Sequence, residues 1–288
     1  MCGIVGAVAE RNVTPILIEG LQRLEYRGYD SAGVALVQAD GEVQRRREVG
    51  KVVNLSNNLD AEPLTGGVGI AHTRWATHGS VQQTNTHPHM SGNDLALVHN
   101  GIIENYITLR EELQSQGYVF ASDTDSEVIV HLIHNCLGDG GLLHAVRRAV
   151  KRLDGAYAIA VCWADEPDRI VAARSGCPLV VGKGIGENFL ASDVLALKAV
   201  TDRFIFLEEG DLVDLRRDRI DIWSIDNEAV LRADVRIEMA KDDFDKGNFR
   251  HYMQKEIFAQ PQVLKETMEG RIGKQTVLEE AFGVGAKD

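Results

Sequence analysis

Short apolar runs alternate with polar and glycine-containing segments over the first hundred residues. Such runs, bounded by turn residues, predict strands over residues 4–8, 31–37, 68–71 and 95–98. Between the first two strands, Leu17, Leu21 and Leu24 recur at helical spacing behind Thr14 and Pro15. Thr14 suits an N-cap and Pro15 suits the first helical position, so we expect a helix there.

Helical patterns fill the middle of the chain, and strand patterns return after it. Helices are expected over residues 106–116, 125–135 and 141–151. Seven short strands are expected over residues 156–163, 170–173, 179–181, 189–191, 203–207, 211–215 and 220–224. Strands at both ends with helices between them predict two packed sheets, each covered by helices on its outer face.

The pattern changes again near residue 240. Residues 241–248 are charged, contain glycine and lack apolar periodicity, as is typical of a linker. Tyr252, Ile257 and Leu264 then mark an amphipathic helix. The remaining residues are too few for a core of their own. We therefore expect one domain over 1–240, followed over 241–288 by a linker and the beginning of a further domain.

Composition narrows the class of protein. The chain has 288 residues, of which 44% are hydrophobic and 26% charged, and its net charge is −12. This acidity argues against nucleic acid or an anionic membrane surface as the main partner. No apolar run approaches the roughly 20 residues that cross a membrane, and no signal segment opens the chain, so we expect a cytoplasmic protein. The four cysteines form no CxxC pair, so neither a disulfide framework nor a structural zinc site is expected.

The candidate chemistry starts at Cys2. If Met1 is removed, Cys2 carries a thiol and a free α-amine on one carbon atom. An α-amine titrates at about 7.7–8.0, so it can take the thiol proton near neutral pH. The alternative is an inert cysteine buried at the start of a strand.

Distant segments offer the other groups that amide hydrolysis needs. Asn100 and Gly101 could supply two donors to an oxyanion, although Asn-Gly is also a common hairpin turn. Arg74 could bind a substrate carboxylate, and the segment 123–125 could bind an ammonium group or could cap the next helix. The polar segment 72–79, which contains Trp75, is expected to be a site loop with Trp75 as a mobile lid.

Two further patterns receive less specific interpretations. His72, His78, His87, His89 and His99 lie close together in sequence, but no metal-binding motif accompanies them, so no metal is expected. The glycine-rich segment 182–186 follows an apolar run but fits no phosphate-loop pattern, so a hairpin is expected.

Several blocks together resemble one family. These are CGIVG at 2–6, LEYRGYDSAG at 24–33, HTRWATHG at 72–79, HNGIIEN at 99–105 and SDTDSE at 122–127. They resemble the N-terminal glutaminase domain of the glucosamine-6-phosphate synthase family, a type-2 glutamine amidotransferase of the N-terminal-nucleophile class. The resemblance implies an α+β fold, a four-layer αββα sandwich of the N-terminal-nucleophile hydrolase type, with no cofactor.

The resemblance also implies roles for individual residues. Cys2 would be the nucleophile, with its α-amine as base, and Asn100 and the Gly101 N–H would form the oxyanion hole. Arg27 would help to order the N-terminal site, and Trp75 would gate the passage of ammonia. Glutamine would be bound at four positions: Arg74 for the α-carboxylate, Asp125 for the ammonium group, and Thr77 and His78 along the same loop.

The implied reaction is hydrolysis of L-glutamine to glutamate and ammonia through a thioester on Cys2. In the family, ammonia passes to a second domain that isomerises and aminates fructose 6-phosphate. Residues 250–261 resemble the entry to that domain, so this chain alone is expected to be a glutaminase, in a possible homodimer. The alternatives are another type-2 enzyme, such as amidophosphoribosyltransferase, or an inactive glutamine-binding regulatory module.

Overall fold

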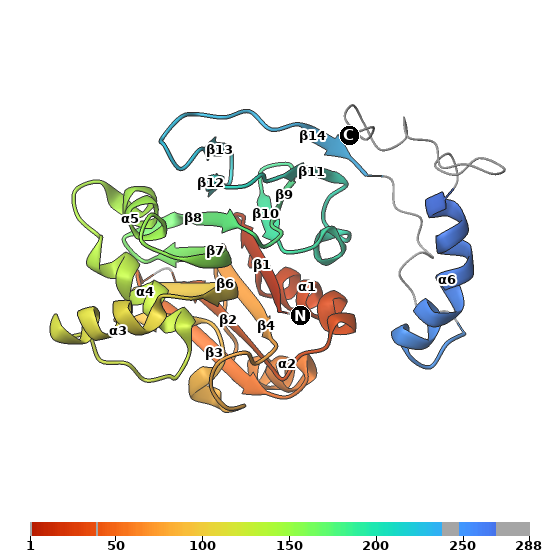
Figure 1. The fold of residues 1–288 in the computed structure, drawn as a ribbon, viewed down its shortest axis with the longest axis horizontal. Coiled ribbons are helices and arrows are strands. Elements are labelled where there is room, and N and C mark those ends of the chain that lie inside the picture. Colours follow the sequence, from red (N-terminus) through yellow and green to blue (C-terminus); the bar gives the residue numbers. More distant parts are fainter. Residues whose placement is uncertain (1, 39, 238–247, 269–288) are drawn as a thin grey trace, which may run out of the picture. The chain divides into compact units, whose positions relative to one another are not determined.

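The computed structural model of the protein describes residues 2–38, 40–237 and 248–268 (Figure 1). The chain divides into two compact units, Met1–Met239 and Ala240–Asp288. All strands of the described part belong to the first unit, and the second contributes the helix α6 (Tyr252–Met268). The expected linker at 241–248 lies outside the described residues, except for its last position. No helix in these described ranges combines the length and the apolar character needed to cross a membrane.

An eight-stranded antiparallel sheet contains the start of the chain at its centre. Its strand order is β14-β11-β9-β10-β1-β4-β2-β3. The strands are β1 (Gly3–Val8), β2 (Ser31–Val37), β3 (Val43–Val49), β4 (Val68–Arg74), β9 (Val180–Lys183), β10 (Asn188–Ala191), β11 (Arg203–Phe206) and β14 (Asp234–Arg236). In the β1–β4 register Gly3 pairs with Thr73, so the beginning of β1 lies beside the end of β4.

A six-stranded antiparallel sheet packs against the first, in the order β13-β12-β8-β7-β6-β5. Its strands are β5 (His89–Ser91), β6 (Leu95–Ile103), β7 (Gly155–Trp163), β8 (Glu166–Ser175), β12 (Leu212–Arg216) and β13 (Ile220–Trp223). The two inner faces share one apolar core, to which β1, β4, β6 and β8 all contribute.

Helices cover both outer faces (Figure 1). Helices α1 (Thr14–Leu24) and α2 (Val52–Ala61) share a core with the eight-stranded sheet. Helices α3 (Tyr106–Ser115), α4 (Asp125–Asn135) and α5 (Gly141–Val150) share another with the six-stranded sheet. Three short 3-10 helices complete the first unit: η1 (Glu25–Arg27), η2 (Gln83–Asn85) and η3 (Val194–Leu197). The predicted four-layer αββα sandwich is thus confirmed.

Several local features differ from the predictions, and the short strands β5 and β14 were not expected. Strand β3 was not predicted, because three consecutive arginines interrupt the apolar alternation of this edge strand. Helix α2 was not predicted either, although Val52, Leu55 and Leu59 are buried at helical spacing. Thr14 is not the N-cap of α1. Val13 occupies that position, and the Thr14 hydroxyl instead donates to the carbonyl of Leu64 at 2.7 Å. The hydroxyl is therefore occupied by a long-range contact.

The inner core ends in polar side chains at one end of the sandwich. Along a strand, every second side chain points to the same face. On β1, Cys2 stands two residues before the inward-facing Ile4, and on β4, His72 and Arg74 continue the row of Ile70. On β6, Asn100 likewise continues the row of Ala96 and Val98. Strand periodicity therefore carries polar groups from three segments to one end of the core.

A buried ion pair joins β8 to β12 in the six-stranded sheet. Nε and Nη2 of Arg169 donate to the two carboxylate oxygens of Asp214 at 2.9 and 2.7 Å, and each side chain is less than a tenth exposed. Asp214→Ala leaves the guanidinium buried without this partner, so we expect the free energy of unfolding to fall by about 3 kcal/mol, measured by urea denaturation.

Asp168→Ala is the matched control, because Asp168 pairs with Arg216 while its own side chain is 64% exposed. An exposed pair of this kind contributes less than about 1 kcal/mol. Equal losses in the two variants would contradict the view that burial makes the first pair important.

Candidate active site

Cys2 lies immediately before β1 and is half-buried. Its Sγ accepts a hydrogen bond from the Trp75 N–H at 3.2 Å and lies 3.5 Å from the Trp75 carbonyl oxygen, to which the thiol donates. Burial raises the pKa of the thiol, and this outweighs the opposing effect of the Trp75 N–H. Near neutral pH the thiol therefore holds its proton, and a nucleophilic sulfur requires a base.

The Asn100 side chain connects Cys2 to the neighbouring strand β4. Its Nδ2 donates to the Cys2 carbonyl oxygen at 3.4 Å, and its Oδ1 lies 3.0 Å from Nε2 of His72. Asn100 and Gly101 lie inside β6, paired with Ala158 and Tyr157, and do not form the hairpin turn that was considered as the alternative.

The position of Gly101 can be occupied only by glycine. Its φ is 131°, and a Cβ there would lie 1.9 Å from the carbonyl oxygen of Ala156. The chain therefore passes β7 at a distance that excludes any side chain. Gly101 also lines the cavity described below, where its N–H could serve an oxyanion.

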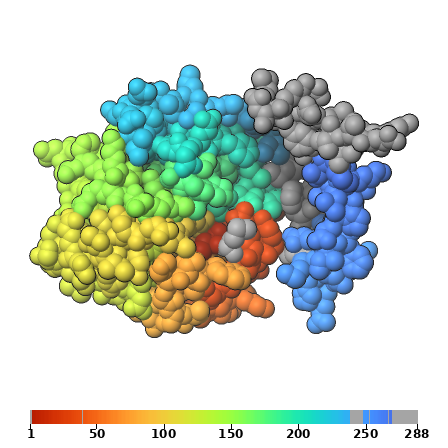
Figure 2. Space-filling model, in the orientation of Figure 1, coloured from red at the N-terminus to blue at the C-terminus, as the bar shows by residue number. Residues whose placement is uncertain are grey.

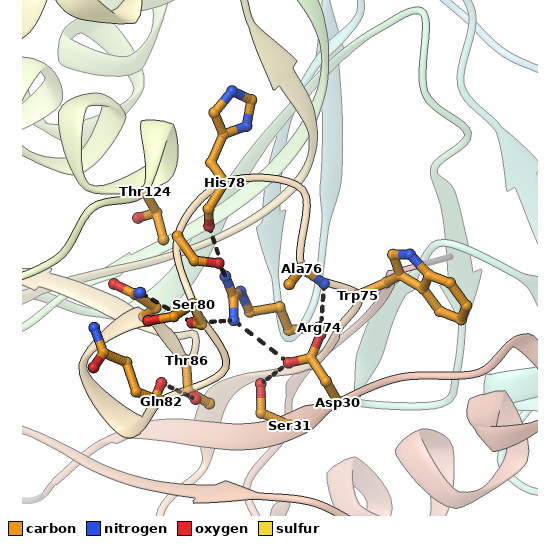
Figure 3. A network of polar contacts seen from close by, with 12 residues as sticks. Asp30, Ser31, Arg74, Trp75, Ala76, His78, Ser80, Gln82, Thr86 and Thr124 are labelled. Carbon is orange, nitrogen blue, oxygen red and sulfur yellow. Dashed lines mark hydrogen bonds and ion pairs between the residues drawn. The ribbon is translucent and has the colours of Figure 1, made fainter.

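Arg74 organises the loop that follows β4 (Figure 3). Its Nη2 donates to the carbonyl oxygens of His78 and Gly79 at 2.6 and 3.2 Å, and its Nη1 donates to that of Ser80 at 3.3 Å. Nη1 also lies 3.4 Å from Oδ1 of Asp30. The guanidinium is 4% exposed, so in this arrangement it is engaged by its own loop. A substrate carboxylate could take these donors only after the loop has moved.

Asp30 holds the same loop from the opposite side. Its Oδ2 accepts a hydrogen bond from the Ala76 N–H at 2.5 Å, and its backbone N–H donates to the Arg74 carbonyl oxygen at 2.7 Å. The Ser31 hydroxyl donates to Oδ1. Asp30 belongs to the family block at residues 24–33, but no role at the site was predicted for it.

Trp75, Thr77 and His78 lie in a loop, as predicted. The first three residues of the segment 72–79 do not lie in that loop. His72, Thr73 and Arg74 belong to β4 and are buried, because their strand pairs on both sides. The Trp75 side chain is 52% exposed and points away from the Arg74 network (Figure 3).

Two ring contacts orient this loop. A Cβ at Gly28 would lie 2.6 Å from the Trp75 ring, so the indole packs directly on the backbone of Gly28. The His78 ring meets Tyr106 edge-on at 5.2 Å, which ties the loop to the beginning of α3. The loop therefore contacts both halves of the sandwich.

Asp125 begins α4, and its side chain is buried. Its Oδ2 accepts a hydrogen bond from the Ile103 N–H at 2.9 Å, and the Ser126 hydroxyl lies 3.4 Å from its Oδ1. The N-cap is Thr124, whose hydroxyl accepts from the Glu127 N–H. Neither aspartate of segment 123–125 is thus the N-cap, and the Asp125 carboxylate retains capacity for a cation.

Of the predicted site residues, Asn100 does not line the cavity described below, and neither does Arg27. It lies in η1, where its guanidinium pairs with Asp193 and donates to the Tyr26 hydroxyl at 3.1 Å. Ser192, next to Asp193, accepts a hydrogen bond from the Ile4 N–H at 3.0 Å. Arg27 does not line the cavity described below, but it holds the segment that bonds to β1.

One cavity of about 20 Å³ brings most of these residues together. It is lined by Cys2, Arg74, Trp75, Thr77, His78, His87, His99, Gly101, Thr124, Asp125 and Ser126. A space of this size holds about one water molecule. In the space-filling view, atoms of the N-terminal segment, coloured red, are visible at the surface (Figure 2). Because an amino acid is much larger than one water molecule, such a substrate can enter the cavity only if part of its wall moves. The loop after β4 forms much of that wall.

Four histidines near the cavity are buried and uncharged near neutral pH: His72, His87, His89 and His99. Burial lowers the pKa of His72 to about 3, and lowers the pKa of His87, His89 and His99 as well. Among residues 2–38, 40–237 and 248–268, no group of three or more His, Cys, Asp and Glu side chains is arranged to hold a metal ion. The segment 182–186 forms the β9–β10 hairpin, as predicted.

No role at the site was predicted for Asp30, His72 or Ser126, and Thr124 was not predicted as the N-cap of α4. A signal for His72 was available, since it stands two residues from both Ile70 and Arg74 on one strand and must share their face. Ser126 and Asp30 gave no comparable signal, because their contacts depend on how distant segments meet.

Known proteins resemble this chain in sequence. Residues 72–199 match the glutamine amidotransferase domain family. Over its full length the chain is 60% identical to a glutamine–fructose-6-phosphate aminotransferase (isomerizing) of Pseudomonas putida and 58% identical to that of Pseudomonas aeruginosa. It covers 47% of each of these proteins, so the chain spans about half the length of the curated relatives that it matches.

Solved structures share the fold. Glutamine phosphoribosylpyrophosphate amidotransferase from B. subtilis superimposes with a TM-score of 0.68 and 26% identity, over 78% of this chain and 49% of that one. A glutamine aminotransferase class-II domain protein from Silicibacter pomeroyi gives a TM-score of 0.54 at 16% identity, over 77% of this chain and 99% of that one. Residues 72–199 therefore belong to the family of glutamine amidotransferase domains, and the chain as a whole corresponds to the N-terminal part of glutamine–fructose-6-phosphate aminotransferases.

Proposed function

We propose that the chain hydrolyses L-glutamine to glutamate and ammonia through a γ-glutamyl thioester on Cys2. The observation that carries the proposal is that Cys2, Gly101 and Asp125, from three distant segments, line one cavity. The cavity thus brings together a sulfur nucleophile, a backbone N–H that can bind an oxyanion, and a carboxylate that can bind a substrate ammonium group. The identity of 60% with aminotransferases whose name includes glutamine supports this substrate.

The raised pKa of the Cys2 thiol makes the α-amine necessary in this mechanism. Removal of Met1 would free that amine, which then takes the thiol proton as sulfur attacks the amide carbon of glutamine. The carbonyl oxygen becomes negative and is stabilised by Nδ2 of Asn100 and the N–H of Gly101. The amine returns the proton to the leaving nitrogen, ammonia departs and the thioester remains.

Water completes the reaction. The α-amine takes a proton from the attacking water, and the same two donors stabilise the second oxyanion. The carbon–sulfur bond then breaks, glutamate is released and the sulfur regains its proton. Because every proton passes through one amine, the rate should fall as pH drops below the pKa of that amine, at about 7.7–8.0 in model compounds.

Substrate recognition requires the loop after β4 to rearrange. Asp125 would bind the α-ammonium group, and Arg74 would exchange its bonds to the His78 and Gly79 carbonyls for the α-carboxylate. Thr77 and His78 would follow the backbone of this loop over the bound glutamine. Trp75 would act as the gate for ammonia, and Arg27 would keep the end of β10 against β1.

We further propose that, in a longer protein, the ammonia is passed to a second domain that aminates fructose 6-phosphate. The names of the relatives support this acceptor. The chain is 60% identical to one of these aminotransferases but only 26% identical to the B. subtilis amidotransferase, so fructose 6-phosphate is favoured over a phosphoribosyl acceptor. Residues 1–240 would be the glutaminase domain, and 241–288 a linker with the beginning of the acceptor domain. The cytoplasmic location and the homodimer stay predictions.

Cys2→Ala tests the nucleophile and separates an enzyme from a glutamine-binding module. Because no other sulfur lines the cavity within the described residues, we expect ammonia release to fall at least about a thousandfold, while calorimetry shows glutamine binding within a few-fold of the original chain. Cys177→Ala is the matched control, since Cys177 is also a half-buried free cysteine, and it should retain turnover. Persistent hydrolysis in Cys2→Ala would refute the proposed mechanism.

Asp125→Asn tests the ammonium site. The amide can still accept from the Ile103 N–H but carries no charge, so we expect KM for glutamine to rise about 10- to 100-fold, with kcat within a few-fold. Asp123→Asn is the control, because Asp123 is exposed and does not line the cavity, and its KM should not change. A larger effect at Asp123 than at Asp125 would exclude the assignment.

A further inference from the structure

His72 is a fully buried side chain beside the reacting groups, and the proposed chemistry gives it no role. It lies on β4 with its ring 0% exposed, stacked on His87 with the ring centroids 4.1 Å apart. Its Nε2 lies 3.0 Å from Oδ1 of Asn100, whereas its Nδ1 is buried and has no hydrogen-bond partner among the described residues. The ring thus hydrogen-bonds to the Asn100 amide, and the backbone of His99 also acts on it.

The amide of Asn100 has two possible orientations, and the structure contains the one that suits an oxyanion hole. The NH2 group faces the carbonyl oxygen of Cys2 at 3.4 Å, while Oδ1 faces His72. With the amide turned over, Oδ1 would face the Cys2 carbonyl, and two acceptors would oppose each other. The Cys2 carbonyl therefore favours the observed orientation, in which Oδ1 is left to accept a hydrogen bond from His72.

The observed orientation of the Asn100 amide requires one tautomer of His72. Oδ1 has no proton to give, so Nε2 must carry the hydrogen of this bond. Burial lowers the pKa of His72 to about 3, so the ring holds a single proton at any pH at which the protein works. A neutral ring with its proton on Nε2 is a donor toward Asn100, and it is not an acid or a base in the reaction.

We propose that His72 is a positioning residue that holds the Asn100 amide with its NH2 group toward the substrate carbonyl. This inference rests on the proposed function, because it gives His72 a role only if Asn100 stabilises an oxyanion. It assigns His72 an effect on the transition state and none on the binding of glutamine. A purely structural role would instead disturb both equally.

His72→Leu removes the donor and leaves Oδ1 of Asn100 buried without a partner. Loss of an oxyanion-hole donor lowers kcat by about 10²–10³-fold, and a misoriented donor should cost part of this. We therefore expect kcat to fall about 10- to 100-fold with KM within threefold. The reaction of Cys2 with iodoacetamide needs no oxyanion hole, so its rate should stay unchanged and report an intact nucleophile.

A pair of amide substitutions keeps the test valid if His72→Leu does not fold. In His72→Gln the side-chain amide nitrogen can reach about as far as Nε2, whereas in His72→Asn it reaches only as far as Nδ1. We expect Gln to restore kcat to within about fivefold of the original chain, in accordance with the net value of a single hydrogen bond, and Asn not to restore it. Equal kcat values in these two variants would overturn the inference.

His131→Leu controls for the loss of any buried histidine. His131 is 6% exposed and bonds to the Ser91 hydroxyl at 2.9 Å, and it does not line the cavity. We expect its kcat to match that of the original chain. A drop equal to that of His72→Leu would mean that removing a buried ring, and not orienting Asn100, lowers the rate.

A double-mutant cycle with Asn100→Ala gives the decisive result. If His72 acts through Asn100, the double variant should be no slower than Asn100→Ala alone, because the orienting bond has nothing left to orient. Additive losses would overturn the inference while leaving the proposed function in place. Absence of glutamine hydrolysis by the original chain would reject the proposed function, and this inference with it.

Discussion

The antiparallel pairing of β1 with β4 fixes the position of Cys2, the proposed nucleophile, relative to the rest of the site. Gly3 pairs with Thr73, so Cys2 lies beside the end of β4, where the Trp75 backbone reaches its sulfur. The facing sheet brings Asn100 to the same end of the inner core. Because β1 is a central strand, with β10 on its other side, this end of the chain is held on both edges. A mobile N-terminus could not keep a thiol and an amine in register with distant donors.

Desolvation governs the chemistry of the site. It raises the pKa of the Cys2 thiol, so the sulfur cannot ionise without a nearby base. The same desolvation keeps His72, His87, His89 and His99 neutral. Buried neutral rings can serve as fixed donors and acceptors, but in the proposed mechanism they do not compete with the α-amine for the transferred proton. These histidines lie close together in sequence, as metal ligands often do, but their role is to close one end of the inner core with uncharged polar side chains.

Strand periodicity made much of the fold and part of the site predictable. The two-sheet sandwich followed from the order of apolar runs, and Cys2 followed from the chemistry of an N-terminal cysteine. The arginine-rich β3 was missed because an edge strand can lack apolar alternation. Contacts such as Asp30 with the Ala76 N–H depend on how loops meet, and no local pattern encodes them. The engagement of Arg74 by its own loop was invisible for the same reason.

The central claim is that the sulfur at the start of the mature chain becomes acylated. The most direct test mixes glutamine with chain that has lost Met1, stops the reaction in acid within one turnover and maps the adduct by mass spectrometry of the N-terminal peptide. The account predicts a γ-glutamyl group on Cys2 that hydroxylamine removes. Hydrolysis at full rate with no adduct on that peptide, or with the adduct on Cys177, would contradict it.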